Sequence, residues 1–143
     1  MIPERWVLDT NVVISAVLSR SGAPASLIDQ LAARRAVLVF STETLAELES
    51  RIMRGKFDRF VGRETRRRFL AELDAVSERV QITGATMGCR DRDDDKVLET
   101  ALSGAAEVIV SGDRDLLTLD PWQQIPILEP AEALSTYFPA ASK

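Results

Sequence analysis

The chain has 143 residues, of which 45% are hydrophobic and 28% are charged, so it can bury one core and shows no sign of disorder. No apolar run approaches the roughly 20 residues of a membrane span, and the first residues lack the basic-then-apolar pattern of a secretory signal. A single cysteine, Cys89, excludes an internal disulfide and is typical of the reducing cytoplasm.

Histidine is absent from the sequence, and this absence restricts the chemistry more than any other count. Ser-His-Asp triads, Cys-His pairs and the usual zinc sites all need an imidazole. We therefore expect Cys89 to be a buried or incidental thiol and not a nucleophile. With 22 acidic residues against 18 basic ones, a hard cation held by carboxylates is the natural candidate for a catalytic group.

Short apolar runs alternate with helical patterns, which predicts one α/β domain over residues 1–143. The expected strands of its mainly parallel sheet are 6–8, 37–40, 80–82, 108–110 and a weaker 125–128. The expected helices are 11–18, 25–35, 41–54, 64–77, 93–102 and 130–137. Ser41 is the expected N-cap of the third helix, in preference to a capping box from Thr44 to Glu47.

Acidic side chains follow several of the expected strands at the point where each strand ends. Asp9 comes directly after the first strand, and Glu47 lies two turns into the helix after the second. Asp95 opens the helix that leads to the fourth strand, which is followed by Asp113 and Asp115. Functional groups of an open parallel sheet gather beyond the carboxyl ends of its strands. If the strand order is 3-2-1-4-5, these acids face one cleft.

Each of these acids also has a purely structural explanation. Asp9 can cap the following helix, and Asp113 and Asp115 can belong to an ordinary turn. Glu47 can lie on the surface, and acids at a helix start stabilise the helix dipole. These explanations leave open why acids recur at the same end of successive strands, where their mutual repulsion destabilises the fold unless a cation is bound.

The net charge of −4 is unevenly distributed along the chain. Residues 51–68 contain eight basic and two acidic residues, whereas residues 91–143 contain four basic and eleven acidic ones. The basic segment can be a solvated helical surface, but beside an acidic metal site it is better explained as a rim that follows phosphates. The expected nucleic-acid contacts in this segment are Arg51, Arg54, Arg66, Arg67 and Arg68.

Four segments together carry a family resemblance: Asp9-Thr10-Asn11-Val12, Glu47-Leu48, Asp95 at a helix start, and Ser111-Gly112-Asp113-Arg114-Asp115-Leu116. Their order and spacing resemble a PIN domain over residues 6 to 128. Segments 91–98 and 110–113 are similar to a compact prokaryotic subgroup of this family that includes the VapC-type toxins of toxin–antitoxin pairs. The implied architecture is a three-layer α/β/α sandwich with about five strands in the order 3-2-1-4-5.

The resemblance also implies an activity, namely metal-dependent cleavage of RNA with Mg²⁺ or Mn²⁺ as the cofactor. By position it implies a catalytic and metal-binding set of Asp9, Glu47, Asp95 and Asp113, with Asp94 as the alternative to Asp95. Its implied supporting residues are Asn11, Ser111 and Asp115. It further implies a homodimer and, for the toxin subgroup, a cognate antitoxin protein.

In such a site the cation polarises the scissile phosphate and lowers the pKa of a bound water for in-line attack, with Glu47 a ligand or the group that orients the water. A haloacid-dehalogenase phosphatase needs a second Asp where this chain has Asn11, and a response-regulator receiver needs paired acids where only Asp9 is present. The alternatives that stay open are a DNA-directed 5′-nuclease, a housekeeping RNA-processing PIN nuclease and a catalytically silent PIN scaffold.

The first two helices contain more apolar residues than one narrow helix stripe buries. This surplus predicts a surface for a second copy or an antitoxin helix, unless the helix over 64–77 covers it. The residues concerned are Val12, Val13, Val17, Leu18, Leu27, Ile28 and Leu31.

Overall fold

The computed structural model describes residues 1–140, so residues 141–143, the last three of the predicted domain, lie outside its description. The strands are β1 (Arg5–Leu8), β2 (Val37–Ser41), β3 (Glu78–Val80), β4 (Val108–Val110) and β5 (Ile127–Leu128). They form one sheet in the order β3-β2-β1-β4-β5, and every neighbouring pair is parallel. The predicted strand order is confirmed.

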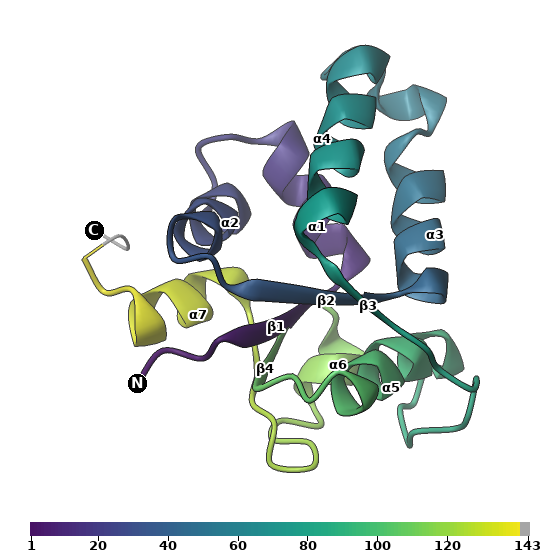
Figure 1. Cartoon of the computed structure of the whole chain (residues 1–143), viewed down its shortest axis with the longest axis vertical. Coiled ribbons are helices and arrows are strands. Elements are labelled where there is room, and N and C mark those ends of the chain that lie inside the picture. The colour runs from purple at the N-terminus through teal and green to yellow at the C-terminus, as the bar shows by residue number, and fades with distance from the viewer. Residues whose placement is uncertain (141–143) are drawn as a thin grey trace.

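The α-helices are α1 (Thr10–Leu18), α2 (Ala23–Ala33), α3 (Thr42–Ile52), α4 (Arg63–Val76), α5 (Asp95–Ser103), α6 (Arg114–Leu117) and α7 (Pro130–Tyr137). Two 3-10 turns, η1 (Gly55–Phe57) and η2 (Arg92–Asp94), precede α4 and α5. Helices α1, α3 and α4 stand on one side of the sheet and α5 and α6 on the other, as expected for a three-layer fold (Figure 1). No helix within residues 1–140 has the length and apolar character needed to cross a membrane.

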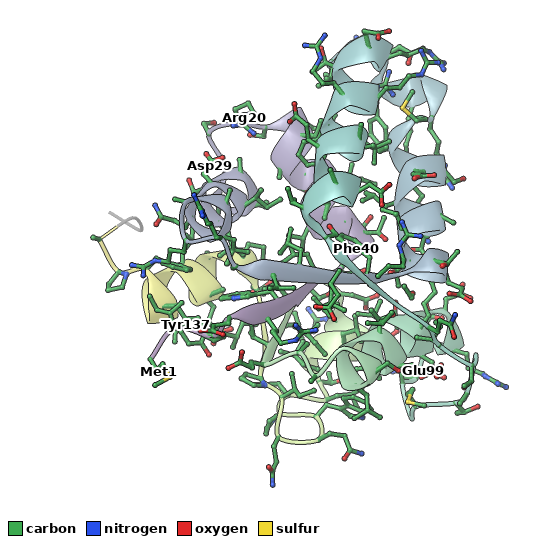
Figure 2. All side chains as sticks on the ribbon, in the orientation of Figure 1. Met1, Arg20, Asp29, Phe40, Glu99 and Tyr137 are labelled. Carbon is green, nitrogen blue, oxygen red and sulfur yellow. The ribbon has the colours of Figure 1, made fainter. Side chains whose placement is uncertain are left out.

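Each face of the sheet packs on its own core, because successive side chains of a strand point to opposite faces. Trp6, Leu8 and Phe40 belong to a larger core under the α1, α3 and α4 layer, whereas Val7 and Val39 belong to a second core with α5 and α6. Figure 2 shows Phe40 and Glu99 on the two sides of the sheet. Strands β1, β2, β4 and β5 are therefore buried on both faces, whereas the edge strand β3 is largely exposed, and the carboxyl ends of the parallel strands lie at one edge of the sheet.

The apolar residues of α1 and α2 pack within the domain. Helix α1 packs on α2 and α3, and α2 packs on α7. All seven residues of the surplus belong to the larger core or pack against it: Val12, Val13, Val17, Leu18, Leu27, Ile28 and Leu31. The chain's own helices cover this surface, so the surplus does not indicate a partner.

The edge strands differ in extent from their predictions. Strand β3 covers Glu78–Val80 instead of 80–82, because its partner β2 ends at Ser41, which pairs with Val80 before α3 begins. Strand β5 covers Ile127–Leu128 instead of 125–128, because Ile125 pairs antiparallel with Trp122 in a tight turn. Ser41 caps α3 as predicted, in a capping box with Thr44.

Candidate metal centre

Asp9 is held at the end of β1 by hydrogen bonds to both of its carboxylate oxygens. Oδ1 accepts the backbone N–H of Thr10 at 2.8 Å, which caps α1, and Oδ2 accepts the hydroxyl of Ser111 at 2.8 Å. The pairing of β1 with β4 brings these two strand ends together. Burial raises the pKa of the Asp9 carboxyl, and the negative charges of Asp113 and Glu47 raise it further.

Ser111 connects Asp9 to Asp113. The Ser111 oxygen accepts the backbone N–H of Asp113 at 2.9 Å while its hydroxyl donates to Asp9, and the residue is fully buried. Asp113 in turn accepts the backbone N–H of Asp115 at 2.9 Å and so caps the short helix α6. The segment after β4 therefore holds two acids in fixed positions relative to Asp9.

Asp94, the last residue of η2, completes this cluster. Its carboxyl lies within hydrogen-bonding reach of Asp113 and in the electrostatic field of Asp9. Burial, the hydrogen bond with Asp113 and the charges of Asp113 and Asp9 raise the pKa of Asp94 to about 8. Two carboxylates repel each other unless they share a proton or a cation, so this site favours bound positive charge.

Asp95, the expected third ligand, makes a different contact. Its Oδ1 accepts the backbone N–H of Cys89 at 2.9 Å, and the residue is buried. This bond anchors the loop that precedes η2, at the residue where α5 begins. The contact with Asp113 is made by Asp94, the alternative that the sequence left open.

Asp94 also belongs to a second group of acids, with Asp91 and Asp115. One carboxylate oxygen from each of these three residues lies within 4.8 Å of the other two. Asp91 was not among the expected site residues, although the run of acids from 91 to 95 marked the segment. Asp115, which was expected to support the site, therefore lies at the rim of the cluster, and its link to the cluster is its proximity to Asp94.

Glu47 is ion-paired on both sides. Arg51 lies one turn further along α3, with its Nη2 at 3.1 Å from Oε1 of Glu47, and Lys96 of α5 forms a close ion pair with Oε2. Glu47 still raises the pKa of Asp9, so its charge acts on the cluster. Lys96 was not expected at the site, because its contact with Glu47 depends on the packing of α3 against α5.

The predicted basic surface contains one residue that is not on the surface. Arg66 is completely buried, and its guanidinium donates to the backbone oxygens of Ile52 at 2.8 Å and Arg54 at 3.2 Å and pairs closely with Asp58. A fully buried guanidinium cannot contact a phosphate of a nucleic acid, so the predicted contact at Arg66 is wrong. The remaining four expected contacts are partly or fully exposed: Arg51, Arg54, Arg67 and Arg68.

Asn11, expected to support Asp9, is exposed near the start of α1. The two oxygens of Asp9 are bonded by Thr10 and Ser111 instead, and Asn11 lines a pocket with Arg51 and Arg54. The loop before the site is held by Glu99, a buried acid that the sequence did not single out. Its carboxylate accepts backbone N–H groups of residues 83–85 at 2.7 to 3.2 Å.

Comparison with known proteins agrees with this geometry. The PIN domain family matches residues 5–115, a range that contains every acid of the cluster. The chain belongs to the PIN domain family. This PIN domain is also 32% identical, over 114 residues, to an uncharacterized protein of Methanocaldococcus jannaschii, and the match covers 79% of this chain and 73% of that protein. No solved structure matches the chain.

PIN domains are generally metal-dependent nucleases. The acids around Asp94 fit that chemistry, because carboxylate oxygens are the ligands that Mg²⁺ and Mn²⁺ prefer and one oxygen each from Asp91, Asp94 and Asp115 lies within 4.8 Å of the other two. The donor set contains no imidazole and no exposed thiolate, since the sequence has no histidine and Cys89 is buried. The site therefore suits a hard divalent cation.

Proposed function

We propose that this PIN domain is a metal-dependent endoribonuclease whose Mg²⁺ or Mn²⁺ is held by Asp9, Asp94 and Asp113. The observation that carries the proposal is the convergence of three carboxyls from separate segments, with the pKa of Asp94 raised to about 8. Asp9 is buried and Asp94 and Asp113 are partly buried, so the repulsion among their carboxylates lowers the stability of the fold, and a bound divalent cation offsets this repulsion. Asp95 then acts on the site through the loop that it anchors.

The bound cation supplies polarisation of the scissile phosphate and a water of lowered pKa. Side chains of the protein would hold the cation, the attacking water and the substrate in position. Ser111 holds one oxygen of Asp9 and the backbone of Asp113, so both carboxylates keep their orientation. Glu47, the acid between Arg51 and Lys96, is the group that orients the attacking water and accepts its proton. Arg51 and Arg54 neutralise phosphates of the substrate.

RNA is the proposed substrate because it follows from the family resemblance and because Arg51, Arg54 and Lys56 line a pocket beside the first turns of α1, the helix that Asp9 caps. Phosphate contacts by Lys and Arg supply most of the affinity of such a surface. The matched control for substrate choice is a DNA strand of the same sequence, and equal cleavage of both strands would make the enzyme a general nuclease.

The experiment that tests the activity is cleavage of a single-stranded RNA in Mg²⁺, in Mn²⁺ and in chelator. We expect cleavage only with metal, and a loss of at least about a hundredfold in Asp9→Asn, which can still cap α1. The matched control is Asp93→Asn, an exposed acid in the same acidic run. Wild-type cleavage in chelator, or an unchanged rate in folded Asp9→Asn, would refute the proposal.

The proposed biological role is the toxin of a type II toxin–antitoxin pair, active in the cytoplasm as a homodimer. It rests on the similarity of residues 91–98 and 110–113 to that subgroup of the family. We expect expression to arrest growth and both Asp9→Asn and the product of an adjacent gene to relieve the arrest. Harmless expression of an active enzyme would instead favour a housekeeping RNA-processing nuclease, and a mass of one chain in solution would exclude the homodimer.

A further inference from the structure

A cationic pocket lies between α1 and the end of α3, next to the acidic cluster. Its volume is about 180 Å³, and it is lined by Asn11, Ile14, Arg51, Arg54, Lys56 and Phe57. Three of these six residues are basic, and none of the described residues that line it is acidic. A concave site with three positive charges and an amide suits a phosphate group.

The position of the pocket relates it to the acidic cluster. Helices α1 and α3 both begin at the carboxyl edge of the sheet, at their caps Asp9 and Ser41. Asn11 and Ile14 lie in the first turns of α1, so the pocket extends about 3 to 8 Å along that helix from Asp9. This wall of the pocket therefore lies within reach of a phosphate close to the one that is cut at the cluster.

Two of the three positive charges of the pocket, those of Arg54 and Lys56, are not neutralised by the protein, whereas Arg51 pairs with Glu47. Asp58 is the acid nearest in sequence to Lys56, but Arg63 and Arg66 occupy its carboxylate. The hydrogen bond from Arg66, supported by Arg63, lowers the pKa of Asp58 and keeps it ionised for these partners. Neither Arg54 nor Lys56 forms an ion pair within the described residues 1–140.

Buried Arg66 also fixes the segment that carries these charges. It bonds the backbone oxygens of Ile52 and Arg54 at the end of α3 and holds Asp58 just after η1. The turn with Arg54 and Lys56 is thereby tied to α4 at both of its ends. A preorganised turn loses little entropy when a ligand binds, which favours a discrete site over a mobile basic surface.

We propose that this pocket is a subsite for one phosphate of the RNA strand, adjacent to the phosphodiester that is cut. The proposal rests on the proposed nuclease function. Arg54 and Lys56 bind the phosphate, and Asn11 donates to it from α1. Phe57 and Ile14 form an apolar wall for the adjoining ribose or base.

Binding of a single-stranded RNA in chelator tests the subsite without catalysis. We expect Arg54→Gln and Lys56→Gln each to raise the Kd about tenfold and to reduce the salt slope by about 0.7. Arg59→Gln is the matched control, because Arg59 is an exposed base of the same segment outside the pocket lining, and it should change the Kd less than about twofold. Equal losses in all three variants would overturn the proposal in favour of a diffuse basic surface.

Neutral methylphosphonate linkages, placed one at a time along the strand, locate the contact. We expect one linkage beside the cleavage position to weaken binding by the wild type and to have no effect in the Arg54→Gln/Lys56→Gln double variant. The same loss in both proteins would refute the subsite. If the double variant cleaves RNA with metal and its KM is unchanged, the subsite is refuted and the nuclease function stands. If the wild type binds RNA but shows no metal-dependent cleavage, only the nuclease function is refuted.

Discussion

The hydroxyl of Ser111 donates to the carboxylate of Asp9 at 2.8 Å, across 102 residues of sequence and between two neighbouring parallel strands. The same oxygen accepts the backbone N–H of Asp113. One buried hydroxyl therefore links two of the proposed metal ligands, and we propose that its role is to orient them and not to bind the metal itself.

Replacement of this hydroxyl should weaken metal binding while the acids stay in place. We expect Ser111→Ala to reduce the affinity for Mn²⁺ about tenfold to a hundredfold, as for other residues that orient metal ligands. The free energy of unfolding should fall by about 1–3 kcal/mol, because an oxygen of Asp9 and the N–H of Asp113 lose their partner. Calorimetric titration and urea denaturation measure the two effects. The control is Ser50→Ala at an exposed position of α3, which should leave the Mn²⁺ affinity unchanged. An unchanged Mn²⁺ affinity in Ser111→Ala would contradict the orienting role of Ser111.

The raised pKa of Asp94 predicts that the metal-free protein loses stability as the pH rises. An unfolded aspartate releases its proton near pH 3.8, whereas folded Asp94 holds it up to about pH 8. Between these values the folded state binds the extra proton, so the free energy of unfolding falls with increasing pH and levels off above the folded pKa. Asp9, whose pKa is also raised, acts in the same direction.

Melting temperatures in chelator, measured between about pH 5 and pH 9, test this dependence. We expect a decline in the wild type, a much flatter profile in Asp94→Asn, and a wild-type decline in the exposed control Asp93→Asn. Acids with lowered pKa values, such as Glu99, lose their stabilising effect only as the pH falls toward their folded pKa, below this range. A wild-type melting temperature that rises with pH would show that Asp94 is not held in its protonated form.

Buried Arg66 should be important for stability, unlike the arginines beside it. We expect Arg66→Met to lower the free energy of unfolding by about 2–4 kcal/mol, because the backbone oxygens of Ile52 and Arg54 lose their donor inside the core. Arg68→Gln, on the exposed side of α4, should cost no more than about 0.5 kcal/mol. Equal stabilities of the two variants in urea denaturation would contradict the buried role.

The sequence predicted the parts of the structure that depend on chain order. The alternation of strands and helices specified the parallel sheet, and the carboxyl ends of β1 and β4 are therefore neighbours. This is why Asp9, Ser111 and Asp113 were expected together and are found together. Their positions depend on the ends of buried strands, which short apolar runs mark clearly.

The parts that the sequence did not determine depend on side-chain direction. In the run from Asp91 to Asp95, a shift of one residue at the start of α5 decides which carboxyl faces Asp113, and the contact of Asp95 with Cys89 sets that start. Arg66 looked like part of a basic surface, although its spacing of four and seven residues from Leu70 and Leu73 places it on the buried stripe of α4. From sequence alone, a charged residue of a helix is assigned to the surface, because the groups that would pair with it in the core are not known.

Calorimetric titration of Mn²⁺ into the wild type, Asp94→Asn and Asp95→Asn tests the central claim most directly, because these variants differ only in which neighbouring acid is neutralised. We expect Asp94→Asn to lose at least about tenfold in affinity, since it removes a charge that faces Asp9 and Asp113. Asp95→Asn keeps an oxygen that can accept the N–H of Cys89, so its affinity should stay within about threefold of the wild type. The reverse order of the two variants, or no Mn²⁺ binding by the wild type, would contradict the account.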